Sequence, residues 1–146
     1  WDEAAKWYQK SADLGNPQGE FRLAELYYNQ DNPGYDPKKA FPLFLKIAEN
    51  EQDNCNCTEA ASYIGYMYLN GEGTEKNFQQ ALHWLRIAAN AGDTTAMHNL
   101  AEMYREGYGI KKDLNRARKL YQQACDEGDD ESCEAYAQLR SKKAKR

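Results

Sequence analysis

Apolar residues along most of this chain recur at intervals of three and four, which places them on one face of an α-helix. Short segments rich in Gly, Asn, Asp and Pro separate these stretches and favour turns. No stretch has the pattern of a β-strand. The pattern therefore predicts an all-α protein of about eight helices, near residues 2–14, 17–30, 37–50, 58–70, 77–91, 94–106, 113–127 and 130–143.

The hydrophobic pattern is itself repeated along the chain. Residues 60–73 read AASYIGYMYLNGEG and residues 96–109 read AMHNLAEMYREGYG, at an offset of 36. The same offset relates Ala81 to Ala117 in the segments that follow. Self-similarity at such a period is typical of helical hairpins stacked into a solenoid.

Less regular copies flank these two. In the preceding copy the Gly-x-Gly turn is lost, with Pro33 and Gly34 nearby, and five extra residues separate this copy from the next. We therefore predict a single repeat domain over residues 1–146. Its expected parts are a half repeat at 2–16, repeats at 17–56, 57–92 and 93–128, and a terminal helix at 130–143.

Several positions within a copy have a physical explanation. Gly65 is small enough to let the two helices of a hairpin approach closely. Gly71 and Gly73 provide the positive φ angles that a turn after the first helix needs. Asn77 and Asp113 are placed to cap the second helices of successive copies. Neither helix of a pair can bury its apolar face alone, so stacked neighbours must close the core.

These copies resemble the Sel1-like repeat, in which Leu-Gly-x-Met-Tyr-x-x-Gly-x-Gly is followed by Asp, Ala, Trp or Tyr, and Ala-Ala-x-x-Gly. Residues 59–92 and 95–128 match this pattern well, and residues 18–51 match it partly. The resemblance implies a right-handed α/α solenoid related to tetratricopeptide repeats, with the first helix of each pair lining a concave surface. Family members mostly act as adaptors or scaffolds. Many bacterial members are periplasmic or secreted, including a cysteine-rich group.

The four cysteines lie in two groups along the sequence, Cys55 with Cys57 and Cys125 with Cys133. In cysteine-rich Sel1-like proteins a disulfide joins adjacent helices at a spacing of eight, so the resemblance favours a Cys125–Cys133 disulfide over two buried thiols. Such a disulfide implies an oxidising compartment. Cys55 and Cys57 lie in the inserted loop, where a local disulfide and free thiols remain equally open. A metal site there lacks further ligands nearby in the sequence.

Charge and motifs limit the function. A net charge of −4 and a pI near 5.3 argue against nucleic acid as the main partner. No apolar run approaches the roughly 18 residues of a membrane span, so no membrane insertion is expected. No serine begins a Ser-x-x-Lys unit, and no phosphate-binding or dinucleotide motif occurs. His83 and His98 lack identifiable partner ligands, so we expect surface or groove residues. We therefore predict no catalysis, no cofactor and no metal.

The resemblance also indicates where a partner would bind. The first helices are expected to present variable positions to the concave face, next to their core residues. Trp7, Leu43, Trp84 and Leu120 are instead expected in the core. The candidate partner-binding residues are Phe21, Glu25, Tyr28, Asn29, Ser62, Tyr66, Leu69, Asn70, His98, Glu102, Arg105, Glu106, Glu134 and Gln138.

The leading hypothesis is a non-catalytic protein–protein interaction module. It would bind a partner protein or peptide on the concave face. Its role would be that of a bacterial cell-envelope regulatory, virulence or immunity protein, and it would be periplasmic or secreted. One alternative is an intracellular adaptor, in the cytoplasm and with reduced thiols. Another is a protein that binds or hydrolyses β-lactams or binds cell-wall fragments. The sequence predicts no oligomeric state.

Overall fold

A computed structural model of the protein describes residues 1–50 and 56–144, and every regular element in these ranges is an α-helix. The predicted helices are all present, and their ends differ from the predicted ends by at most two residues. None of the helices in the described ranges has the length and apolar content of a membrane span. The helices are α1 (Asp2–Asp13), α2 (Pro17–Tyr28), α3 (Pro37–Ala48), α4 (Cys57–Asn70), α5 (Phe78–Asn90), α6 (Thr94–Glu106), α7 (Leu114–Asp126) and α8 (Asp130–Ala144).

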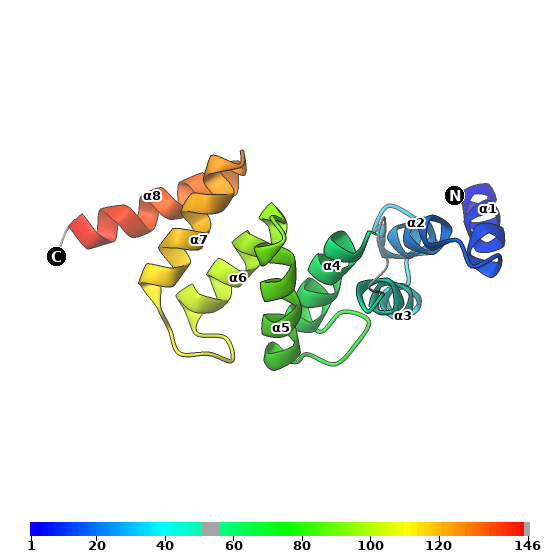
Figure 1. The fold of residues 1–146 in the computed structure, drawn as a ribbon, viewed down its shortest axis with the longest axis horizontal. Coiled ribbons are helices and arrows are strands. Elements are labelled where there is room, and N and C mark those ends of the chain that lie inside the picture. Colours follow the sequence, from blue (N-terminus) through cyan, green and yellow to red (C-terminus); the bar gives the residue numbers. More distant parts are fainter. Residues whose placement is uncertain (51–55, 145–146) are drawn as a thin grey trace.

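The helices form an elongated stack in which the two ends of the chain lie far apart (Figure 1). Each helix packs against its neighbours in the chain, and α4 also contacts α6. Helices α2 and α3, α4 and α5, and α6 and α7 make three successive hairpins. We call α2, α4, α6 and α8 the A helices, and α1, α3, α5 and α7 the B helices. This arrangement confirms the predicted solenoid.

The hairpin turns follow the chemistry of their residues. Gly71 and Gly107 end α4 and α6 in the left-handed conformation, with φ of 70° and 74°. Asn77 caps α5 and Asp113 caps α7, and each side-chain oxygen accepts a hydrogen bond from the amide three residues further on, at 3.1 Å. Side-chain caps therefore begin the second helices, and glycines end the first helices, where the sequence predicts.

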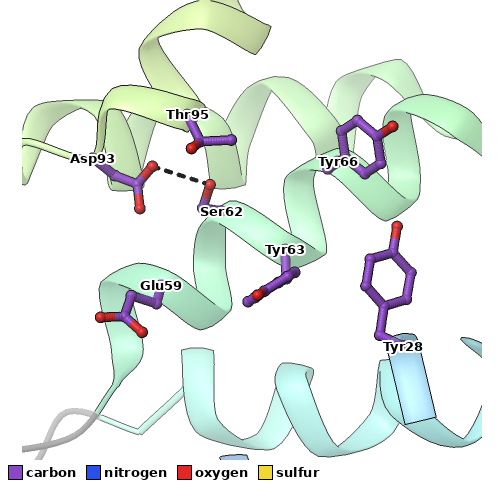
Figure 2. Close-up of a pocket in the computed structure, with 7 residues that line it drawn as sticks. All are labelled: Tyr28, Glu59, Ser62, Tyr63, Tyr66, Asp93 and Thr95. Atoms are coloured by element: carbon purple, nitrogen blue, oxygen red, sulfur yellow. Dashed lines mark hydrogen bonds between the residues drawn. The ribbon is translucent and has the colours of Figure 1, made fainter. Parts of the chain in front are cut away.

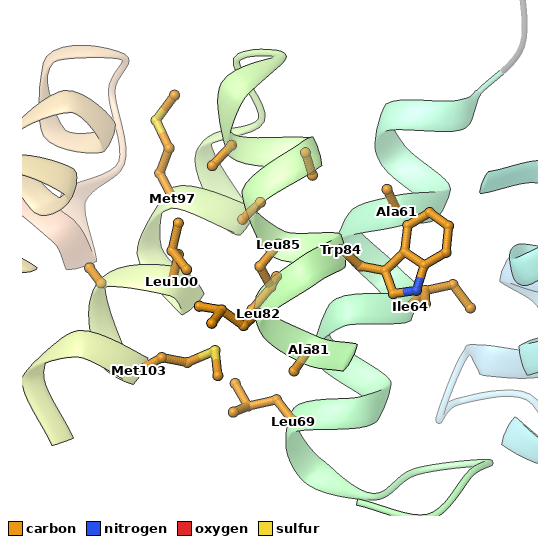
Figure 3. Close-up of a cluster of buried hydrophobic side chains, with 14 of the residues drawn as sticks. Ala61, Ile64, Leu69, Ala81, Leu82, Trp84, Leu85, Met97, Leu100 and Met103 are labelled. Atoms are coloured by element: carbon orange, nitrogen blue, oxygen red, sulfur yellow. The ribbon is translucent and has the colours of Figure 1, made fainter. Parts of the chain in front are cut away.

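Close approach between A and B helices depends on small residues. A Cβ atom added to Gly65 on α4 would lie 2.6 Å from Cγ of Leu85 on α5. The equivalent residues of the other hairpins, Ala24 and Ala101, are fully buried. Figure 3 shows the resulting core, in which apolar side chains of α4, α5 and α6 pack together.

The prediction that Trp7 belongs to the core is wrong, because its side chain is 67% exposed. Trp84, at the corresponding position of α5, is only 9% exposed and is confirmed as a core residue. Helix α5 packs between α4 and α6, whereas α1 packs closely only on α2 within the described residues. The indole of Trp7 consequently lacks a second covering helix. Leu43 and Leu120 pack against the core but are only partly buried.

The last helix is joined to the solenoid covalently. Cys125 on α7 and Cys133 on α8 form a disulfide, with their Cα atoms 4.6 Å apart, as the resemblance implies. The prediction for the pair Cys55 and Cys57 concerns residue 55, which lies outside the described residues.

Candidate functional site

A pocket of about 420 Å³ opens on the face formed by the A helices, which we call the A-helix pocket (Figure 2). Its walls come from three successive repeats, because α2, α4 and the start of α6 all contribute. Its lining residues are Tyr28, Glu59, Ser62, Tyr63, Tyr66, Asp93 and Thr95.

Three tyrosine rings lie on one side of the pocket, and two of them pack against Phe44. The ring of Tyr63 stacks on Phe44 of α3, with centroids 4.4 Å apart and planes at 14°. Tyr28 meets Tyr63 edge-on at 5.8 Å and Phe44 edge-on at 6.3 Å. Tyr66 is 38% exposed at the rim. Because Phe44 orients two of the rings, the tyrosines on α2 and α4 form a preorganised wall.

The phenol groups of this wall donate to carboxylates. Tyr28 Oη donates to Glu72 at 2.8 Å, and Tyr63 Oη donates to Glu25 at 3.3 Å. Burial, with a smaller contribution from Glu25, raises the pKa of Tyr63 to about 12. Burial and Glu72 raise the pKa of Tyr28 further still. Both phenols are therefore protonated at neutral pH.

The other side of the pocket is polar. Asp93 caps α6 by accepting from the Ala96 amide at 2.9 Å, and the same oxygen accepts from Ser62 Oγ at 3.2 Å. Glu59 is exposed and accepts a hydrogen bond from Asn56 at 3.2 Å. Asp93 is thus fixed by two hydrogen bonds, which hold a carboxylate at the junction between α4 and α6.

One position of the repeat explains why the pocket lies here. Phe21, Ser62 and His98 occupy the same place on α2, α4 and α6, and each contacts the next A helix or its start. Phe21 packs on Tyr63 at 6.3 Å, while His98 lies 2.9 Å from Ser132 on α8. Ser62 is much smaller than phenylalanine or histidine. At this position of the repeat the gap between successive A helices is therefore filled by Phe21 and by His98 but stays open beside Ser62.

A second cluster surrounds His98 near the C-terminal end. Nε2 of His98 lies 3.2 Å from Glu102, and Nδ1 lies 2.9 Å from Ser132 Oγ, which in turn donates to Asp129. The hydrogen bond to Glu102 raises the pKa of His98 above its usual value, and the same bond lowers the pKa of Glu102. Within the described ranges, no three His, Cys, Asp or Glu side chains are placed to hold a metal ion.

The contact between a serine and a histidine in this cluster does not make a usable nucleophile. Ser132 is completely buried, and its hydroxyl proton is donated to Asp129. A catalytic serine must instead reach the substrate and give its proton to the histidine. The cluster therefore serves to connect α6 with α8.

The sequence-predicted site residues divide into groups. Tyr28, Ser62 and Tyr66 line the A-helix pocket. Arg105, Glu106 and Gln138 line a separate hollow between α6 and α8. The remaining residues do not share one site: Glu25 pairs with Arg22, His98 and Glu102 form the second cluster, and Asn29, Asn70 and Glu134 line neither hollow.

Two of the predicted residues are corrected by the structure. Phe21 is 1% exposed and Leu69 is 7% exposed, so both belong to the core rather than to an exposed binding surface. Phe21 is covered because it packs edge-on against Phe44 and is also in contact with Tyr63. The residues Glu59, Tyr63, Asp93 and Thr95 were missed. Glu59 and Tyr63 had a sequence signal, because their spacing places them on the same helical face as Ser62 and Tyr66.

Comparison with known proteins gives a consistent result. The family model described as Sel1 repeat matches residues 2–16, 17–51, 58–93 and 94–129. An uncharacterised protein of Neisseria meningitidis serogroup B is 31% identical over 139 residues, which are 95% of this chain and 27% of that protein. The chain therefore spans only about a quarter of that relative's length.

Solved structures show the same architecture. The crystal structure of a Sel1 repeat protein from Oxalobacter formigenes superposes with a TM-score of 0.78 at 32% identity, covering 93% of this chain and 54% of that one. Cysteine-rich protein B of Helicobacter pylori superposes with a TM-score of 0.65 at 22% identity, covering 92% of both chains. The second similarity concerns the fold alone.

Proposed function

Because the chain belongs to the Sel1 repeat family, whose repeats generally mediate protein–protein interactions, we propose that it holds a partner protein or peptide on the face of its A helices. Proteins of this family are generally scaffolds without catalytic activity, and we propose the same for this chain. The interaction surface runs from α2 to α6, with the A-helix pocket at its centre.

The observation that carries the proposal is that the A-helix pocket is built from several repeats. Residues from three successive repeats line one hollow, so that a bound segment could contact several repeats at once. Its exposed tyrosine, Tyr66, belongs to a residue type that is enriched where binding energy concentrates. Binding pockets are commonly concave and aromatic, with a few fixed polar groups, and Asp93 and Ser62 supply such groups here.

We further propose a location in an oxidising compartment of a bacterium, either the periplasm or the exterior. The Cys125–Cys133 disulfide supports this, because disulfides persist where thiols are not kept reduced. The similar cysteine-rich protein of Helicobacter pylori is consistent with it. In that compartment the protein would have a regulatory, virulence or immunity role and would bind another protein of the cell envelope.

Affinity capture with matched variants tests the binding face. Tyr66→Ala combined with Arg105→Ala removes two A-helix side chains, whereas Ile87→Ala combined with Lys119→Ala removes exposed side chains of B helices. The first pair should weaken partner binding at least about tenfold with little change in melting temperature, as hot-spot truncations do. The second pair should leave binding unchanged. A loss with the B-helix pair alone would contradict the proposal.

A further inference from the structure

The A-helix pocket carries negative charge that nothing inside it neutralises. Glu59 and Asp93 line it, and the described residues that line it include no lysine or arginine. In the described part of the chain neither carboxylate takes part in an ion pair. Both hydrogen bonds that Asp93 accepts use Oδ1, so its second oxygen remains available to a ligand.

The tyrosine wall adds to this negative character. The phenol groups of Tyr28 and Tyr63 donate hydrogen bonds to carboxylates, and these bonds increase the electron density of the rings. Glu72, the acceptor for Tyr28, has no cationic partner among the described residues. The π-face of an electron-rich ring attracts a cation within about 6 Å. Ring faces and carboxylates thus favour the same kind of ligand.

Arg22, which pairs with a carboxylate of the tyrosine wall, does not fill the pocket. Arg22 is bound to Glu25 at 3.0 Å, and its side chain is 57% exposed. It is not among the pocket-lining residues. Among the described carboxylates around the tyrosines, Glu25 has a cationic partner, whereas Glu59, Glu72 and Asp93 are in no ion pair.

From this arrangement we propose that the A-helix pocket binds a lysine or arginine side chain on an exposed segment of the partner. The inference rests on the proposed function and names the chemistry of its central contact. The cationic head would lie between Asp93 and Glu59, and the aliphatic stem would lie along the rings of Tyr63 and Tyr66.

Other side chains fit the pocket less well. An acidic side chain would be repelled by the carboxylates that are already present. An apolar side chain would cover Glu59 and Asp93 without giving them a partner, and burying an unpaired charge is costly. Charge complementarity therefore selects a basic side chain.

Amide titration by NMR tests the pocket with simple probes. N-acetyl-lysine methylamide and N-acetyl-arginine methylamide are added to the labelled full chain, with the norleucine and glutamate analogues as neutral and acidic controls. We expect saturable shifts at the amides of Ser62, Tyr63 and Thr95 with the basic probes only. A single side chain binds with a Kd of order 1 mM or weaker, so the titration extends to about 50 mM.

Isosteric variants separate the pocket from general electrostatics. Glu59→Gln with Asp93→Asn removes both charges but keeps an oxygen for the α6 cap, since asparagine caps as well as aspartate does. Glu75→Gln with Glu127→Gln makes the same change in net charge at exposed positions outside the pocket. The first pair should weaken lysine binding at least about tenfold, and the second less than about twofold.

Three results would overturn the proposal: equal shifts with norleucine, no saturable shift with either basic probe, or equal losses in the two variant pairs. Selection from a displayed random peptide library keeps the proposed function separate. Peptides that need Tyr66 but contain no lysine or arginine would overturn the cation pocket and leave the proposed function standing. If all selected peptides bind the Tyr66→Ala, Arg105→Ala variant as tightly as the wild type, the result would count against the proposed function itself.

Discussion

Ser132 at the start of α8 lies within hydrogen-bond distance of His98 on α6, with 2.9 Å between Ser132 Oγ and His98 Nδ1. The contact joins two A helices that are separated by α7 in the chain. It lies next to Cys133, whose disulfide joins α8 to α7. The terminal helix is thus attached to both helices of the last hairpin, by a covalent bond and by a polar cluster.

The His98 cluster predicts a pH-dependent stability. The pKa of His98 is raised by the Glu102 hydrogen bond, so the folded protein holds this proton more tightly than the unfolded chain. The resulting stability is complete below the usual histidine value of 6.5 and is lost as the pH rises through the folded pKa. The lowered pKa of Glu102 adds stability above its usual value of 4.5, which is lost on acidification. Stability from the pair is therefore greatest between these limits.

Thermal unfolding measures this effect. His98 also faces Asp129 and Glu131 from the α8 side and the ring of Tyr121 from α7. We expect the wild type to lose about 1.5–3 kcal/mol as the pH rises from 6.5 through the folded pKa of His98, as for one hydrogen bond to a charged group. His98→Gln should remove this dependence, and His83→Gln, on the exposed face of α5, should keep it. An identical pH profile in the His98 variant would contradict the assignment.

The Cys125–Cys133 disulfide should stabilise the terminal hairpin. Closing a loop of eight residues by a disulfide contributes about 2.5 kcal/mol in the chain-entropy model. In a Cys55→Ser, Cys57→Ser background, reductant should lower the free energy of unfolding by about this amount and should first release amide protons of α8 to exchange. Mass spectrometry without reductant should find the linked peptides. Unchanged stability and exchange after reduction would show that the disulfide does not secure α8.

Gly65 should be intolerant of larger side chains. Gly65→Ala removes a helix-weakening glycine, yet the new methyl group would lie 2.6 Å from Leu85 Cγ, so we expect a net loss of about 1–3 kcal/mol in urea unfolding. Gly65→Leu should cost more. Combining Gly65→Ala with Leu85→Ala should give a smaller loss than the sum of the two single variants, because both act at one contact. Additive losses would place the cause elsewhere.

The fold follows from the sequence because each copy repeats the same requirements. Gly71 and Gly107 end their A helices in the same conformation, and Asn77 and Asp113 begin the B helices that follow. Trp7 was mispredicted because it has the core position of Trp84, yet among the described helices only α2 packs closely on α1. Periodicity describes which face of a helix is apolar, but not whether a second helix covers it.

The site was less predictable for a related reason. Alignment placed Phe21, Ser62 and His98 at one position of the repeat, but only the size of each side chain decides whether that junction is filled or open. The pocket also needs Phe44 of a B helix to orient Tyr63, and Asp93 of the next repeat to form the far wall. Contributions from three repeats cannot be assigned from the pattern of one.

Site-specific photo-crosslinking in the native host tests the central claim, that partners bind on the A-helix face. A benzophenone amino acid is placed at Tyr66 on α4 or, as the matched control, at Ile87 on α5, which is 44% exposed against 38% for Tyr66. The account predicts a discrete crosslinked partner with the probe at Tyr66 and none with the probe at Ile87. The same partner crosslinked at Ile87 and absent at Tyr66 would contradict it.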